Sequence, residues 1–258
     1  MELRKAFAYR VAFWVNFILG IISELMVAYF LWRAVFEARG VIALEGFTFR
    51  GILFYYVIGA TAQRIVRASG EGIIAQEIYD GSLTRYLLYP LPFLGYKYVA
   101  TVAQQTLGFL QLALCLGLAV SIMGLPVDQN ISATSILMGS VATVVAGYLY
   151  FSVSVMLEMV AFWQDTIWNL LAMFRFMSSL LGGLTVPIVF FPQWAQKALA
   201  LSPFPYLFSF PIKSFLGQVS LSQWMLQIMI LGSWSLLFTW MYSSVWKNGT
   251  KHYNGVGI

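Results

Sequence analysis

No charged residue occurs between Lys97 and Asp128. Residues 99–125 within this interval exceed the roughly 20 residues that a helix needs to cross the hydrocarbon core of a bilayer. The rest of the chain agrees, because 60% of its residues are hydrophobic and only 10% are charged, whereas soluble domains carry about 25% charged residues. Charged groups are costly in hydrocarbon, so this deficit predicts an all-α polytopic membrane protein.

Further apolar stretches predict six membrane-spanning helices within one transmembrane domain, residues 1–258. We expect these spans at about residues 12–32, 47–66, 99–125, 131–157, 167–189 and 224–246. Residues 1–10 mix apolar Leu3 and Phe7 with basic side chains, which predicts a short amphipathic helix lying at the membrane interface. A polar connection is expected over residues 36–49.

The segment before the last predicted span is apolar but rich in proline. A continuous helix is excluded there, because proline removes a backbone donor and clashes with the preceding turn. We therefore expect short, broken helices that re-enter the outer membrane face between spans five and six, shielded by other helices. The prolines are Pro187, Pro192, Pro203, Pro205 and Pro211.

The distribution of basic residues predicts the orientation in the membrane. Six spans place both termini on one side, where the basic residues are Arg4, Lys5, Arg10, Arg64, Arg67, Arg85, Lys97, Lys247 and Lys251. Fewer lie on the other side, namely Arg33, Arg39, Arg50, Lys197 and Lys213. The excess predicts cytoplasmic termini. It also explains the net charge of +5 without nucleic-acid binding.

The polar exception among the spans is Gly70–Pro92, which this topology places in the cytoplasm. Asp80-Gly81-Ser82 is a turn signal that divides the segment into two short helical pieces. We expect Gly70–Tyr79 to extend the second span outwards and Ser82–Tyr89 to dock another protein, with the hinge at Asp80-Gly81. The charged residues of the segment are Glu71, Glu77, Asp80 and Arg85, and its apolar residues include Leu83, Leu87 and Leu88.

Several classes of catalytic site are excluded by residue counts. His252 is the only histidine and Cys115 the only cysteine, so histidine-based metal sites, Ser-His triads and multi-thiolate sites within the chain are excluded. The phosphate-binding pattern G-x-x-x-x-G-K-[ST] does not occur. If the protein uses ATP, another chain must hydrolyse it.

Two ionisable residues lie inside predicted spans and are therefore candidate functional residues. Glu24 interrupts the first span and Arg175 the fifth. They either pair directly, or each meets backbone and hydroxyl groups or caps a water-filled crevice. Glu158 and Asp165 flank the turn after the fourth span, and we interpret them as interfacial charges that terminate helices.

Gly70–Pro92 resembles the cytoplasmic loop of ABC-2 type (type V) exporter permeases, in the compact six-span subgroup without a fused nucleotide-binding domain. In that loop an acidic residue precedes a glycine, an L-x-x-L-L motif and a proline. The corresponding residues here are Glu77, Gly81, Leu83, Leu87, Leu88 and Pro90, with Tyr86 where leucine is common. The N-terminal interfacial helix and the proline-rich hairpin are similar to that family as well.

This resemblance implies a half-transporter in the cytoplasmic (inner) membrane of a prokaryote. Two permeases, identical or related, would pair with two ATP-binding subunits that bind ATP and Mg, and would export a hydrophobic or amphipathic substrate. The chain itself would not be an enzyme and would bind no cofactor or metal. Contact with the ATPase is implied for Glu71, Glu77, Asp80, Gly81, Leu83, Arg85, Leu87, Leu88 and Pro90.

Two other functions remain open from the residues alone. One is an intramembrane lipid-modifying enzyme that uses Glu24 or Glu158 as a catalytic carboxylate. The other is a channel or scaffold subunit.

Overall fold

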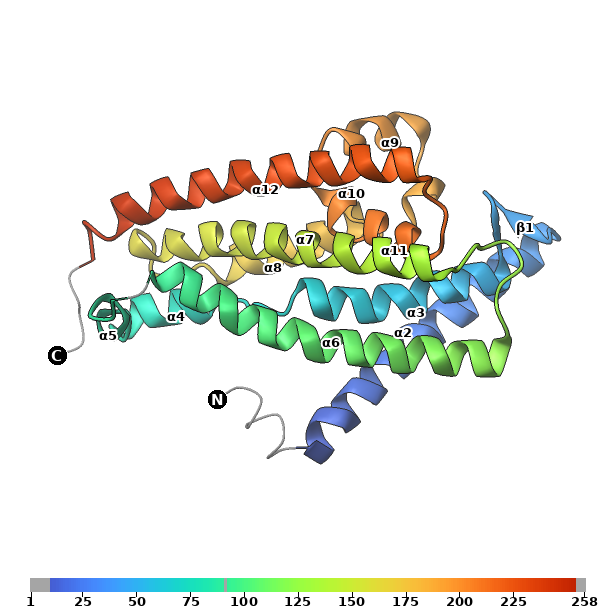
Figure 1. Ribbon diagram of the computed structural model, residues 1–258, viewed down its shortest axis with the longest axis horizontal. Helices are drawn as coiled ribbons and strands as arrows, with labels where there is room; N and C mark the ends of the chain where they lie inside the picture. Colours follow the sequence, from blue (N-terminus) through green and yellow to red (C-terminus); the bar gives the residue numbers. More distant parts are fainter. Residues whose placement is uncertain (1–9, 91, 254–258) are drawn as a thin grey trace.

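The computed structural model describes residues 10–90 and 92–253, and the interfacial helix predicted for the N-terminus lies almost wholly outside them. The described chain is an elongated bundle of helices with one small β-hairpin (Figure 1). Four of its helices are long and apolar enough to cross a membrane: α2 (Arg10–Arg39), α6 (Phe93–Met123), α7 (Ala133–Glu158) and α12 (Leu221–Gly249). The prediction of an all-α polytopic membrane protein is therefore confirmed.

The remaining two predicted spans correspond to shorter helices, α3 (Phe49–Val66) and α8 (Trp168–Leu181). Neither is among the four candidate spans. The number of spans and their bounds thus stay predictions, although a helix lies within each of the six predicted stretches.

Helix α2 runs further than the sequence suggested. It continues to Arg39 and ends at Gly40, which has a φ of +60° and donates its N–H to Phe36 O at 2.9 Å. A two-stranded hairpin follows, with β1 (Ala43–Leu44) and β2 (Phe47–Thr48) joined by two residues of positive φ. The connection predicted for 36–49 thus begins with the end of α2 and continues as the hairpin.

Helix α3 lies at the centre of the bundle, against α2, α6, α7 and the short α11 (Ser209–Phe215). Most of its residues are buried, because other helices cover it from several sides. Thr48 caps its first turn by accepting the N–H of Gly51. Asp128, from the loop after α6, in turn accepts from the backbone N–H and hydroxyl of Thr48 at 3.0 and 2.6 Å.

Helix α8 is shorter than the span predicted for 167–189. It ends at Leu181, and Gly183 follows with a φ of +86°, a conformation that favours glycine. Tyr55 of α3 donates its hydroxyl to Gly183 O at 2.7 Å and fixes this turn. The proline-rich segment then forms short helices, as predicted: η2 (Ile188–Phe190), α9 (Gln193–Ala200), α10 (Phe204–Leu207) and α11.

The expected continuation of the second span through Gly70–Tyr79 is wrong. Helix α3 ends at Val66, and two glycines with positive φ, Gly70 and Gly72, turn the chain before α4 (Ile73–Tyr79) begins. The predicted break at Asp80-Gly81-Ser82 is confirmed, because α5 (Leu83–Leu87) starts directly after it. The segment is thus a separate helical pair rather than an extension of α3.

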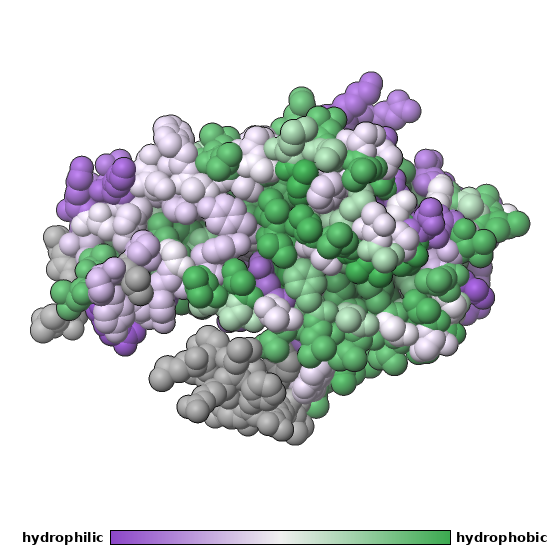
Figure 2. Space-filling view, in the orientation of Figure 1, coloured by the Kyte–Doolittle hydropathy of each residue, from purple (hydrophilic) through white to green (hydrophobic). Residues whose placement is uncertain are grey.

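The visible surface of the bundle follows the same organisation. Figure 2 shows hydrophobic residues over much of its middle and hydrophilic residues mainly towards its two ends. This is the distribution expected for a protein whose middle faces hydrocarbon.

Candidate functional site

Helices α4 and α5 lie at the end of the bundle opposite the β-hairpin, close to the C-terminal end of α12 (Figure 1). Their inward faces share a cluster of buried apolar side chains with α6, α7 and η1 (Met159–Phe162). Ile74, Ile78 and Leu83 are the anchors of the pair, and Leu83 is completely buried. The two short helices are therefore held on the bundle by ordinary core packing.

A buried carboxylate of α7 fixes the start of α4. Glu158 Oε2 accepts the backbone N–H of Ile74 at 2.8 Å and that of Ala75 at 3.3 Å. The first N–H groups of a helix have no partner within the helix and carry its positive dipole end. Glu158 supplies the acceptor, from a position that is only 3% exposed.

An ionic cluster joins the α3–α4 connection to α8. Glu71 accepts the Nε–H of Arg175 at 2.7 Å, forms a second contact with the same guanidinium, and accepts the Tyr150 hydroxyl. The Glu71 side chain is 8% exposed and that of Arg175 is 58% exposed. The carboxylate therefore belongs to the interior and the arginine to the surface of α8.

Arg67, just past the end of α3, extends this cluster. It donates to the hydroxyls of Ser178 and Ser179 at 3.0 and 2.7 Å and to the backbone carbonyl of Arg175. Its guanidinium also lies over the ring of Phe208, 4.9 Å from the centre. Arg67 and Glu71 thereby both bond the connection between α3 and α4 to α8.

Two further contacts close the other side of the helical pair. Lys97 at the start of α6 forms an ion pair with Glu77 of α4 and lies 4.6 Å from the ring centre of Tyr86. Tyr253, beyond α12, donates its hydroxyl to Gly81 O at 2.8 Å. The turn between α4 and α5 is therefore held from outside as well as by its own residues.

The residues of α5 and its flanks that point away from the bundle form what we call the α5 surface: Asp80, Arg85, Leu87, Leu88 and Pro90. Leu88 is 81% exposed and Leu87 is 46% exposed, beside the charged Asp80 and Arg85. Hydrogen bonding from Ser82 lowers the pKa of Asp80, so this carboxylate is ionised at neutral pH. An apolar centre with charged neighbours is suited to binding another protein.

The predicted contact residues thus fall into two groups. Glu71, Glu77 and Leu83 are engaged inside the chain, whereas the α5 surface is open, and Gly81 forms the turn between the two helices. The positive φ of +77° at Gly81 explains the glycine there.

The direct pair of Glu24 with Arg175 does not form. Glu24 accepts two hydrogen bonds from the side-chain amide of Gln63 at 2.9 and 2.8 Å, and Arg175 pairs with Glu71. Arg175 lies in the middle of α8, which begins at Trp168. It is close to the connection between α3 and α4, where Glu71 bonds to it.

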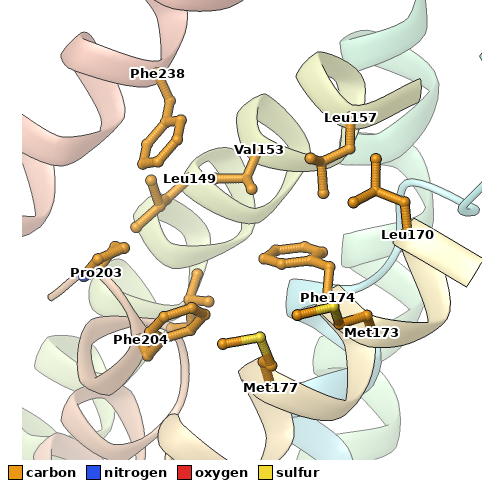
Figure 3. A pocket seen from close by; sticks show the side chains of 11 residues that line it. Leu149, Val153, Leu157, Leu170, Met173, Phe174, Met177, Pro203, Phe204 and Phe238 are labelled. Carbon is orange, nitrogen blue, oxygen red and sulfur yellow. The ribbon is translucent and has the colours of Figure 1, made fainter. Parts of the chain in front are cut away.

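An apolar pocket of about 210 Å³ lies between α7, α8, α10 and α12. Figure 3 shows Met173, Phe174 and Met177 of α8 turned towards it, opposite Leu149 and Val153 of α7. Methionine side chains adapt readily to changes of shape. Helix α8 is therefore bonded firmly at Arg175 but packed loosely along this face.

Sequence reasoning missed the role of Glu158, which it interpreted as an interfacial charge. One feature of the sequence does point to a buried carboxylate: Glu158 directly follows an apolar stretch and has no basic residue near it to pair with. Asp165 is exposed, in keeping with its interpretation. Among the described residues, no group of three or more His, Cys, Asp or Glu side chains is placed to hold a metal ion.

The fold and the site together define a nearly all-helical integral membrane protein that displays a short helical pair at one end. In a comparison with known families, residues 22–257 match the family described as ABC-2 family transporter protein. The chain belongs to this family, whose members are membrane permease subunits of ABC transporters, are not themselves catalytic, and work with an ATP-binding subunit. Comparisons with curated proteins and with solved structures give no significant match.

Proposed function

We propose that this chain is the permease of an ATP-driven exporter and that its α5 surface is seated on the ATP-binding subunit. The observation that carries this proposal is the combination of an open apolar surface on α5 with buried anchors behind it. Leu87 and Leu88 are exposed although they lie next to the completely buried Leu83. A partner protein that covers them would remove apolar surface from water.

The anchors supply a route by which movement of the partner reaches the membrane helices. A push on α5 acts on α4 through the turn at Gly81, and α4 is bonded to α7 through Glu158. Glu71, just ahead of α4, is bonded to α8 through Arg175. Because α8 is loosely packed beside the methionine-lined pocket, it is the helix that we expect to move.

The proposed assembly contains two permeases, identical or related, and two ATP-binding subunits that hold ATP and Mg. We propose six spans with both termini in the cytoplasm of a prokaryotic inner membrane, with α3 and α8 as the additional spans. Helix α3 needs little contact with lipid, because most of its surface is covered by other helices. The proposed substrate is hydrophobic or amphipathic.

The experiment begins with affinity purification of the chain in mild detergent and identification of the ATP-binding subunit that accompanies it. The variant Leu87→Asp/Leu88→Asp is then compared with the unaltered chain. We expect the double variant to lose the ATP-binding subunit and any stimulation of its ATPase rate, because two carboxylates replace the apolar centre of the α5 surface.

The matched control is Ile42→Asp, which places a carboxylate on an exposed residue at the opposite end of the molecule. It should leave both complex and ATPase stimulation intact. Full retention of complex and stimulation by the double variant would show that docking occurs elsewhere. Reconstitution of the complex into vesicles, with ATP-dependent movement of a fluorescent amphipathic dye as the readout, tests export itself.

A further inference from the structure

A large apolar groove lies on the other side of the bundle centre, between α2, α3 and α6, with a volume of about 770 Å³. Ile21 and Met26 of α2, Val57 of α3 and Leu118 of α6 are among its lining residues. Leu118 and Met26 are also more than half exposed. Since α2 and α6 are both candidate spans, the groove opens sideways towards the membrane.

Arg64 of α3 lies at one end of this groove. Its guanidinium carbon is 5.1 Å from the ring centre of Phe17, a lining residue. The guanidinium also occupies space left by Gly20, where an added Cβ would approach Arg64 Nη2 to 2.6 Å. A glycine on α2 thus makes room for a cation between two helices.

The charge of Arg64 is incompletely matched within the described part of the chain. Its Nε atom is buried without a hydrogen-bond partner among these residues. Glu24, one turn along α2 from Gly20, attracts the charge of Arg64 but directs both carboxylate oxygens to Gln63, and among the described residues it makes no direct ion-pair contact with Arg64. A half-buried guanidinium with a buried, unpartnered Nε–H favours an anionic ligand that can accept its hydrogen bonds.

We propose that the groove binds an anionic glycerophospholipid, with the phosphate on Arg64 and an acyl chain along α2 and α6. The dimensions agree, because α3 rises about 16 Å from Arg64 to the lining residue Leu53. This is close to half of the roughly 30 Å hydrocarbon core, the depth of one leaflet. On the proposed topology, the Arg64 end faces the cytoplasmic leaflet.

A bound phospholipid fits this groove better than a second copy of the chain. A protein partner would have to bring its own carboxylate to Arg64 through hydrocarbon, whereas a phospholipid carries its phosphate at the height where its chains begin. Binding also requires no additional subunit. The bound lipid would act as a wedge that holds α2 away from α6.

The test is native mass spectrometry of the permease alone, released from mixed micelles that contain equal amounts of phosphatidylglycerol and phosphatidylcholine with identical acyl chains. We expect the unaltered chain to retain phosphatidylglycerol about tenfold over phosphatidylcholine. Both lipids carry the phosphate, but the choline cation neutralises its charge, and one charge-assisted interaction corresponds to roughly that factor. Arg64→Gln should abolish this preference and Arg64→Lys should restore part of it. Leu118→Trp, which fills the groove, should lower retention of both lipids.

The matched control is Arg33→Gln, which removes an equal charge from an exposed ion pair further along α2. It should keep the preference. Equal retention of the two lipids by the unaltered chain, or a preference that survives Arg64→Gln, would overturn the proposal. A Leu118→Trp variant that keeps its lipid but changes from dimer to monomer would also overturn it, by assigning the groove to a second copy. None of these outcomes depends on the ATP-binding subunit.

Discussion

Replacing Glu158 by alanine should release α4 from the bundle without unfolding the long helices. The carboxylate bonds the N–H groups of Ile74 and Ala75, and no other side chain among the described residues bonds to either of them. The apolar anchors of α4 remain in the variant. The expected result is therefore local opening of residues 73–79 rather than global loss of structure.

The magnitude follows from the two hydrogen bonds. Removing the acceptor leaves a buried N–H group unsatisfied, which costs about 1–3 kcal/mol, and the 3.3 Å bond to Ala75 adds little to the 2.8 Å bond to Ile74. Part of this loss is offset, because alanine avoids the cost of burying the carboxylate. A net change of about 2 kcal/mol corresponds to a roughly 30-fold increase in local opening.

Hydrogen–deuterium exchange in detergent measures this opening peptide by peptide. Peptides covering α4 should exchange about 30-fold faster in Glu158→Ala, whereas peptides of α6 and α12 should keep their rates. Glu37→Ala is the matched control, because Glu37 is an exposed carboxylate paired with Arg33 on α2. Unchanged protection of α4 in Glu158→Ala would refute the reasoning that this carboxylate holds the helix.

Three further predictions concern other contacts. Arg175→Gln should lower stability by about 1–2 kcal/mol, because the interior Glu71 loses its cation; adding Glu71→Gln should recover part of the loss in a double-mutant cycle of detergent melting temperatures. Gly183→Ala should cost about 1–2 kcal/mol through its left-handed backbone, whereas Gly232→Ala, which meets open space on α12, should not destabilise. Partial burial opposes ionisation of Asp128, but hydrogen bonds from the cap residue of α3 outweigh it and lower its pKa. The stabilisation is therefore present above about pH 4 and lost as pH falls further, so the difference in melting temperature between the unaltered chain and Asp128→Asn should shrink between pH 6 and pH 3.

The long helices and the turn at Gly81 could be predicted from the sequence because each depends on local features. An uncharged stretch such as 99–125 leaves few alternatives to a helix in a membrane. Gly81 follows an aspartate that can bond the next turn, and this chemistry operates within a few residues. The short helices of the proline-rich segment follow from the same local rules.

Contacts between segments that are far apart in the sequence could not be predicted from local patterns. Glu158 and Ile74 are separated by 84 positions, and nothing near either residue shows that they meet. The same applies to Glu71 and Arg175, which are 104 positions apart. The sequence leaves a pair of Arg175 with Glu24 open as an alternative, and only the fold shows that Arg175 bonds to Glu71. The sequence does not show that α3 ends at Val66, because glycines also occur within helices and only their positive φ reveals that Gly70 and Gly72 turn the chain.

The hydrogen bond from Tyr253 to Gly81 O spans 172 positions of sequence. Thr84 adds a second hydroxyl contact to the same tyrosine at 3.1 Å. During synthesis, α4 and α5 emerge long before Tyr253. They lack its hydrogen bonds until α12 has been made and inserted. The turn between α4 and α5 therefore receives these two contacts only after α12 has been made, although the apolar anchors behind it lie earlier in the chain.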